Sequence, residues 1–245
     1  MPWLRTAWAS FVVGLAIVFV AGGAALVALV TGGTAPVVHR FYRAFARVTL
    51  FGFRSHVIAS GRDRLEPGRR YVVAVNHQSH LDVPAVILAL GEHPVRFVAK
   101  QELGRIPIFG AALRLSGTVF VTRSDTRADV EGMDAAQRAL LEHVSVLFFA
   151  EGTRSATGAL GPFKKGAAAF ALKSGLPLVP VGIAGSREIL PRGLRSGPGG
   201  PIAVSIGRPM ETRGRPLEDR VQLTDALRAA VETEIEAARR MLPAR

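Results

Sequence analysis

The sequence predicts an α/β protein whose mixed, mostly parallel sheet is flanked by helices and preceded by an apolar membrane segment. Two observations predict this class. After about residue 55, short apolar segments alternate with longer segments of helical periodicity, which is the pattern of chains that build parallel sheets. Before that point, residues 8–30 carry no charged side chain. A run of roughly 20 apolar residues is enough to cross the hydrocarbon core of a bilayer.

The apolar segment favours a single N-terminal membrane helix, and two alternatives stay open. Gly22 and Gly23 lie in its middle, so a helical hairpin that enters one leaflet is the first alternative. A cleaved signal peptide is the second, because small residues follow an apolar stretch, but the apolar run continues past them. Arg5 precedes the segment, whereas a larger group of cationic or titratable residues follows it: His39, Arg40, Arg43 and Arg47. This bias places the following chain on the cytoplasmic side.

Residues 36–53 mix arginine with aromatic and aliphatic side chains and predict an amphipathic helix. Such a helix either lies at the membrane interface, with its arginines reaching lipid phosphates, or packs as an ordinary helix on the folded domain. Both possibilities stay open. We therefore expect residues 1–54 to anchor the protein and residues 55–245 to form its folded domain.

The elements of the folded domain follow in order from apolar segments and their punctuation. Strands are expected at residues 71–75, 95–99, 118–121, 144–149, 177–183 and 202–206. Helices are expected at residues 82–90, 107–115, 127–142, 163–174 and 218–242. Asp82 is placed to cap the first of these helices, with Pro84 in its first turn. Gly175, shortly before Pro177, is typical of a helix end.

Composition narrows the possible partners. The net charge of +12, from 31 basic and 19 acidic residues, favours an anionic partner such as nucleic acid, an acidic membrane or a phosphorylated substrate. The sequence lacks the interleaved aromatic and basic residues of single-strand binding surfaces, so we expect no nucleic acid partner. The absence of cysteine excludes disulfides, thiolate metal sites and a cysteine nucleophile.

The chemistry-bearing residues gather where strands end, which is where ligands bind in open α/β sheets. The segment NHQSHLD follows the first apolar strand and places His77 five residues before Asp82. A carboxylate on one imidazole nitrogen raises the basicity of the other, as a general base requires. Two alternatives remain open: Asp82 only caps the helix while His77 fills a polar loop, or both join His80 in a metal site.

A second polar cluster, AEGTRS, follows the strand expected at 144–149. Its turn offers Gly152, Thr153 and Arg154 to a phosphate, while Glu151 can bind a substrate hydroxyl or Arg154 itself. A solvated turn with a local ion pair is the alternative. Further cations stand at the ends of neighbouring strands or just after this turn: Lys100, Arg123, Lys164 and Lys165. Their shared placement favours an anion-binding pocket.

Four sequence blocks carry a resemblance to a known family. The first is the histidine–aspartate block NHQSHLD, and the second is GTVFVTR, which ends at Arg123 and follows FVAKQELGRIPIFG. The third is FAEGTRS, and the fourth is the apolar block LVPV. In this order and spacing they resemble the glycerolipid acyltransferase family, and within it the 1-acylglycerol-3-phosphate acyltransferases. Ala150 departs from the proline that the family usually has there.

The resemblance implies a glycerol-3-phosphate acyltransferase-like fold and a specific reaction. A fatty acyl group would pass from acyl-CoA or acyl carrier protein to the 2-hydroxyl of 1-acylglycerol-3-phosphate, giving phosphatidate in phospholipid biosynthesis. It implies His77 as the general base and Asp82 as the group that orients it. The remaining candidates for substrate binding are Lys100, Arg123, Glu151, Gly152, Thr153 and Arg154. No metal or redox cofactor is implied, and the enzyme would act on the cytoplasmic face of the inner membrane, at anionic lipid.

Three other functions are compatible with the same residues. The closest is an acyltransferase for another lyso-lipid acceptor, such as a lyso-ornithine lipid. A non-catalytic basic protein that binds membranes would need neither His77 nor Asp82. A metal-dependent hydrolase would use His77, His80 and Asp82 as ligands.

Overall fold

The computed structural model describes residues 2–31, 36–107, 110–111, 114, 118–121, 144–191, 193 and 196–243. The strands are β1 (Ser55–Ser60), β2 (Val72–Val75), β3 (Val95–Lys100), β4 (Val119–Val121), β5 (Ser145–Phe149), β6 (Leu178–Ala184) and β7 (Gly200–Ile206). The helices are α1 (Pro2–Leu15), the π-helical η1 (Ala16–Ala21), α2 (Gly22–Thr31), α3 (Pro36–Gly52), α4 (Asp82–Leu90), α7 (Gly166–Ser174), α8 (Ser186–Ile189) and α9 (Arg220–Met241). Short 3-10 turns occupy Arg62–Arg64, Gln101–Arg105 and Leu217–Asp219.

The described strands form one sheet in the order β1-β7-β6-β2-β5-β3-β4. All neighbouring pairs are parallel except β6 and β7. Val75, the last residue of β2, is in register with Phe149 of β5 and Val181 of β6. The carboxyl ends of three adjacent strands therefore meet at one edge of the sheet. The predicted α/β class and the mixed, mostly parallel sheet are confirmed.

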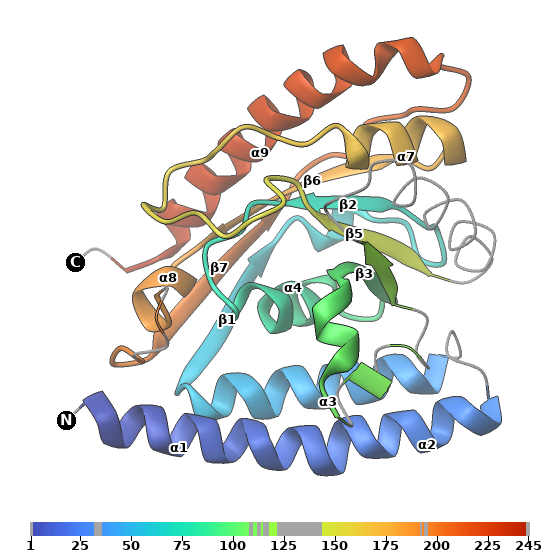
Figure 1. The fold of residues 1–245 in the computed structure, drawn as a ribbon. Helices are drawn as coiled ribbons and strands as arrows, with labels where there is room; N and C mark the ends of the chain where they lie inside the picture. The colour runs from blue at the N-terminus through green and yellow to red at the C-terminus, as the bar shows by residue number, and fades with distance from the viewer. Residues whose placement is uncertain are drawn as a thin grey trace.

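The two faces of the sheet are covered by different helices (Figure 1). On one face, Val73 and Val75 belong to an apolar cluster that includes residues of α4. On the other face, Val72 and Ala74 belong to a cluster with residues of α7 and α9. Residues of β2 thus alternate between the two clusters, as the two-residue period of a strand requires, and all four of its residues are fully buried. Such burial explains why β2 is continuously apolar in the sequence.

The predicted elements that fall within the described residues are present, with small shifts at their ends. The expected strands correspond to β2 through β7, and the expected helix at 82–90 is α4. The helix at 163–174 begins later, at Gly166, and the C-terminal helix is α9. The helix expected at 127–142 lies outside the described residues, as does most of the one at 107–115. The strand β1 was not predicted, because its only apolar stretch is three residues long and lies at the edge of the sheet.

The N-terminal helices form a layer on the α4 side of the sheet (Figure 1). The segments α1, η1 and α2 run as one helix, because Gly22 keeps right-handed helical dihedral angles. The helix therefore continues through Gly22 and Gly23. A hairpin with its turn at this glycine pair, the first alternative, is not what the structure shows. Helix α3 packs on α4 with one side, and its Phe51 ring contacts Trp8 of α1. The stretch Trp3–Ala24 is long and apolar enough to cross a membrane.

The N-terminal helix exposes an apolar face that no described residue covers. Its exposed large apolar residues are Trp3, Leu4, Trp8, Phe11, Leu15, Val18, Phe19, Leu26, Leu29 and Val30. Helix α3, by contrast, turns Val38 and Leu50 inward and leaves Arg40 and Arg47 exposed. Both interpretations of residues 36–53 are thus partly realised: the helix packs on the domain and still presents arginines. A contiguous exposed apolar surface of this kind is typical of a protein in contact with a membrane.

We predict that Gly182→Ala strongly destabilises the protein. A Cβ at Gly182 would lie 2.2 Å from the backbone of Glu234 and Ile235 in α9, so the helix would have to move off the sheet. Overpacking of this kind costs about 1–3 kcal/mol or more. Urea unfolding measures the change in the free energy of unfolding.

Gly166→Ala is the matched control, because a Cβ there meets only Phe148, at 4.0 Å, at the start of α7. It is expected to be neutral or to stabilise by up to about 1 kcal/mol. Equal unfolding midpoints for the two variants would contradict the close packing of α9 on β6.

Candidate active site

The candidate site lies at the sheet edge where β2, β5 and β6 end together. The chain leaves β2 at Val75, passes through residues 76–81 and enters α4 at Asp82. The turn after β5 carries Glu151 to Arg154, and the short helix α8 follows β6. Both segments lie at the same end of the sheet as the loop after β2 (Figure 1). Polar groups from three separate segments are thereby brought together.

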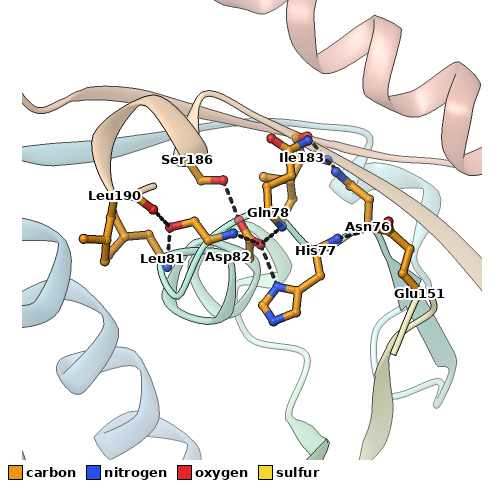
Figure 2. Close-up of polar contacts among 10 residues, drawn as sticks. Asn76, His77, Gln78, Leu81, Asp82, Glu151, Ile183, Ser186 and Leu190 are labelled. Atoms are coloured by element: carbon orange, nitrogen blue, oxygen red, sulfur yellow. Dashed lines mark hydrogen bonds and ion pairs between the residues drawn. The ribbon is translucent and has the colours of Figure 1, made fainter. Parts of the chain in front are cut away.

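His77 and Asp82 contact each other directly. The Nδ1 atom of His77 lies 2.8 Å from Oδ2 of Asp82 (Figure 2). Asp82 is fully buried, whereas the His77 side chain keeps 16% of its surface exposed. Because an ionised carboxylate only accepts hydrogen bonds, Nδ1 carries the proton and donates it to Asp82. The lone pair is then on Nε2, which points away from Asp82 and forms no hydrogen bond with a described residue.

The carboxylate of Asp82 is held by three further donors. The backbone N–H groups of Gln78 and Ser79 donate to Oδ2 at 2.6 and 2.8 Å, and the Ser186 hydroxyl donates to Oδ1 at 2.5 Å. The expectation that Asp82 caps α4 is therefore wrong in detail. Asp82 is the first residue of the helix, and its side chain turns back onto the preceding loop instead of binding the amides of the first turn. With four donors, the buried carboxylate is satisfied in its charged form.

The loop that carries His77 is fastened to β6 by amide side chains. Asn76 donates from Nδ2 to the carbonyl of Ile183 at 3.1 Å and accepts from its N–H at Oδ1, at 2.8 Å. The side chain of Gln78 donates to the same carbonyl at 3.3 Å. The ring of His77 also stacks on Phe149, with centroids 3.8 Å apart and an interplanar angle of 19°. These contacts leave the imidazole little freedom to turn away from Asp82.

Glu151 connects the two loops through backbone amides. Its Oε1 accepts the N–H of His77 at 2.9 Å, and its Oε2 accepts the N–H of Gly161 at 2.9 Å. The Ser155 N–H in turn donates to the His77 carbonyl at 2.7 Å. Glu151 is buried, and through these contacts it holds the loop of His77 against the segment that contains Gly161. No ion pair links it to Arg154 among the described residues.

The turn after Glu151 places its remaining polar residues toward solvent. Gly152 adopts a left-handed conformation, with φ of 72°, and a Cβ there would meet the Lys164 side chain at 3.3 Å. Thr153 is exposed and Arg154 is half-buried. Lys164 therefore packs against the turn that carries Arg154, although it belongs to the segment leading into α7. Two cations thus border this turn without a carboxylate partner among the described residues.

Arg154 also acts on His80. Desolvation lowers the pKa of His80 from its usual value, and the positive charge of Arg154 lowers it further, as does His77 when it is protonated, while Asp82 opposes them. The side chains of the first polar loop and of the EGTR turn are therefore close enough to interact electrostatically. Among the described residues, no group of three His, Cys, Asp or Glu side chains is arranged to hold a metal ion.

Two further residues were predicted for the site, Lys100 and Arg123, and the structure describes only the backbone of Lys100. The backbone of Lys100 ends β3, next to the polar loops of the neighbouring strands. Its side chain is not part of the described structure, and Arg123 lies outside the described residues. The structure thus brings together His77, Asp82, Glu151 and Arg154.

Ser186 and Asn76 were not among the predicted site residues. Ser186 donates to Asp82, and Asn76 joins the loop of His77 to the backbone of Ile183 in β6. A usable signal existed for Ser186, since it follows a strand, β6, at the same carboxyl edge and comes directly after a glycine. Asn76 stood in the motif itself, beside the histidine. A serine or asparagine is so common in loops that sequence alone gives neither one a partner.

The fold and the histidine–aspartate pair together define an α/β protein whose strand-end site holds an imidazole against a buried carboxylate, the arrangement that a general base requires. The family model described as Acyltransferase matches residues 56–184, more than half of the chain. The chain belongs to this acyltransferase family, and the resemblance predicted from the four motifs is confirmed.

Similar proteins support the same assignment. The 1-acyl-sn-glycerol-3-phosphate acyltransferase BAT2 of Brassica napus is 35% identical over 155 residues, which are 63% of this chain and 44% of that protein. The 1-acyl-sn-glycerol-3-phosphate acyltransferase alpha of Ovis aries is 33% identical over 185 residues, or 75% of this chain and 63% of that protein. The chain thus spans about half to two thirds of the length of these relatives.

A solved structure is similar over nearly the whole chain. The crystal structure of the 1-acyl-sn-glycerophosphate acyltransferase PlsC from Thermotoga maritima matches with a TM-score of 0.83 and 25% identity. The match covers 99% of this chain and 98% of that one. The similarity therefore includes the N-terminal helices as well as the α/β domain.

The departure at Ala150 has a visible structural effect. Its N–H donates to the Val75 carbonyl at 3.0 Å, which extends the pairing of β2 and β5 by one bond beyond the strands. Proline has no N–H and could not form this bond. The substitution therefore tightens the edge where the two polar loops begin.

Proposed function

We propose that the protein transfers a fatty acyl group from an acyl thioester to the 2-hydroxyl of 1-acylglycerol-3-phosphate, giving phosphatidate. Either acyl-CoA or acyl carrier protein can serve as the thioester donor. The contact between His77 and the buried Asp82 carries the proposal. The names of the similar proteins support the acceptor, and the cations beside the site suit its phosphate.

The reaction follows from the orientation of the imidazole. His77 Nε2 accepts the proton of the acceptor hydroxyl while the hydroxyl oxygen attacks the thioester carbonyl carbon. Asp82, bonded to Nδ1, stabilises the imidazolium that forms. The tetrahedral intermediate then collapses, the carbon–sulfur bond breaks, and the leaving thiolate takes the proton from His77. Protein and substrates supply every atom that moves, so we expect no metal or redox cofactor.

Three cationic residues, Arg154, Lys100 and Arg123, are proposed to hold the acceptor phosphate. Arg154 stands at the turn beside His77, and its planar guanidinium can bind a phosphate through paired N–H groups. Lys100 ends the strand next to β5 and is proposed to contribute from there, together with Arg123. The exposed Thr153 adds a neutral donor to the same turn, and Gly152, whose own N–H donates to the Phe149 carbonyl, gives the turn its left-handed backbone. Glu151 does not contact the phosphate in this proposal; it positions His77 by accepting hydrogen bonds from the backbone of His77 and of Gly161.

Residues 1–54 are proposed to seat residues 55–245, the acyltransferase domain, on the cytoplasmic face of the inner membrane, at anionic lipid. The orientation of the helices supports insertion into one leaflet over a full crossing. The long N-terminal helix packs lengthwise along α3, and α3 packs on α4 of the domain. A crossing would carry the exposed Arg40 and Arg47 into the hydrocarbon, which is costly. An in-plane position buries the apolar face and leaves these arginines at lipid phosphates.

We predict that His77→Ala lowers kcat for acyl transfer by roughly 10²- to 10⁴-fold, the usual contribution of a general base. Asp82→Asn should lower it by a similar factor, because the amide no longer stabilises the imidazolium. Thioester consumption with lysophosphatidate measures both. His56→Ala, on the exposed face of β1, is the control and should keep the normal rate. A near-normal rate in the His77 variant, with thermal unfolding unchanged, would contradict the mechanism.

Arg154→Ala is expected to act mainly on acceptor binding. Losing a charged hydrogen bond to phosphate should raise KM for lysophosphatidate by roughly ten- to a hundredfold, with a smaller effect on kcat. Steady-state kinetics with varied acceptor measure this split. Arg213→Ala, an exposed arginine at the opposite edge of the sheet, should leave KM unchanged. An unchanged KM in the Arg154 variant would remove its phosphate role.

A further inference from the structure

Ser186 is buried next to the carboxylate of the proposed mechanism. It is the first residue of α8, has no exposed surface, and donates its hydroxyl to Oδ1 of Asp82 at 2.5 Å. The preceding Gly185 holds a left-handed conformation with φ of 89°, and a Cβ there would lie 2.7 Å from the Pro201 carbonyl. The backbone before Ser186 is thus fixed by β7. The hydroxyl has little room to move away from Asp82.

The two oxygens of Asp82 have separate partners. Oδ2 faces His77 and the two backbone N–H groups, while Oδ1 faces only Ser186 among the described residues. Helix α8 is itself fixed to the loop of residues 76–81, which carries His77. The Ser79 hydroxyl in this loop donates to the carbonyl of Leu190, the residue after α8, at 2.8 Å (Figure 2). The Ser186 hydroxyl therefore determines the angle at which the carboxylate plane meets the imidazole.

We propose that Ser186 is a positioning residue of the active site, which holds Asp82 by Oδ1 so that Oδ2 meets His77. Without the hydroxyl, Oδ1 would be buried and unsatisfied, which is costly for a charged group. The carboxylate would then turn toward another donor, and Oδ2 would meet the Nδ1–H of His77 less directly. The other charged or titratable groups near His77 are His80 and Arg154, with Glu151 bonded to its backbone. None of them contacts Oδ1.

Titration of His77 tests this role without depending on turnover. Full-length protein labelled with ¹⁵N-histidine is titrated in detergent micelles, and the His77 signals are assigned by their loss in His77→Asn. In Ser186→Ala, the midpoint of the His77 titration should move to lower pH by roughly half a unit or more, because a displaced carboxylate stabilises the imidazolium less. Ser186→Thr, which keeps the hydroxyl, should return it toward the original value.

Ser205→Ala is a matched control, because Ser205 is also buried and donates to a carboxylate, that of Glu234, away from the site. It should leave the His77 midpoint unchanged. An unchanged or raised midpoint in Ser186→Ala would overturn the proposal. The role in turnover rests on the proposed function: kcat for Ser186→Ala should fall roughly tenfold with both KM values retained. If no transfer is found even in the original protein, the proposed function fails, while the titration still decides the role of Ser186.

A separate cleft lies where the N-terminal helix meets the domain. It has a volume of about 490 Å³ and is lined by Leu4, Arg5, Trp8, Gly52, Phe53, Arg54, Ser196 and Gly197. Its walls are fastened together: the Ser196 N–H donates to the Thr6 hydroxyl at 3.1 Å, and the Gly200 N–H donates to the Arg54 carbonyl at 3.1 Å. Arg54 has a φ of 53°, a conformation that costs energy for a residue with a side chain.

The chemistry of this cleft combines two cations with an apolar rim. Neither Arg5 nor Arg54 forms an ion pair with any residue in the described parts of the chain, and the lining contains no acid. Leu4 and Trp8, which are 49% and 46% exposed, continue the apolar face of the N-terminal helix into the cleft. Tryptophan is enriched at the level of lipid headgroups. A ligand that fits is anionic at one end and apolar at the other.

We infer that this cleft binds one anionic glycerophospholipid of the surrounding bilayer, with its phosphate between Arg5 and Arg54. The first methylenes of its acyl chains would lie against Leu4 and Trp8. Charge complementarity and the continuity with the exposed apolar face carry the inference. The site is separate from the acceptor site, since none of its lining residues belongs to the loops that carry His77 or Arg154.

Native mass spectrometry of the full chain with added phosphatidylglycerol tests the lipid site. The double variant Arg5→Gln, Arg54→Asn should lose affinity for the lipid by roughly tenfold or more. Asparagine is chosen at 54 because it tolerates the left-handed conformation. The control Arg208→Gln, Arg213→Gln removes the same charge from exposed positions in the segment between β7 and α9, outside the cleft, and should bind normally. Equal losses in both doubles, no loss in either, or displacement by millimolar inorganic phosphate would overturn the inference.

Discussion

The structure depends on one buried charge, the carboxylate of Asp82. A buried carboxylate without partners would become protonated or destabilise the fold. Here it accepts hydrogen bonds from His77, Ser186 and two backbone N–H groups. Satisfying the charge and orienting the imidazole are therefore the same requirement. The five-residue spacing of the motif follows, because the loop must leave the strand, turn, and return its aspartate beneath the histidine.

The rest of the fold provides the donors and holds them in place. Parallel pairing aligns the ends of β2, β5 and β6, so that the loops after them lie together. The backbone of Ile183, near the end of β6, binds the side chain of Asn76, while Glu151 after β5 binds the backbone of His77. On the α4 side of the sheet, the N-terminal helices add an apolar layer. A lipid hydroxyl and a water-soluble thioester can meet at such a boundary.

Much of this arrangement could be predicted from the sequence, and the reasons for the rest are physical. Continuous apolar runs predicted β2 and β6 because both strands are buried on two faces. The motif predicted the contact of His77 with Asp82, since five residues suffice to close that loop. Strand β1 was missed because an edge strand needs few apolar residues. The contact of Ser186 with Asp82 spans 104 positions and depends on sheet order, which local pattern does not encode.

The central claim is that the imidazole held by Asp82 removes the proton from a lipid hydroxyl that attacks a thioester. The most direct measurement is a crystal structure of the protein with lysophosphatidate and a non-reactive thioether analogue of the acyl donor. The account predicts the acceptor 2-hydroxyl within about 3.2 Å of His77 Nε2, on the side that faces the analogue's acyl carbon. A hydroxyl bound away from His77, or a Nε2 atom enclosed by protein in the complex, would contradict it.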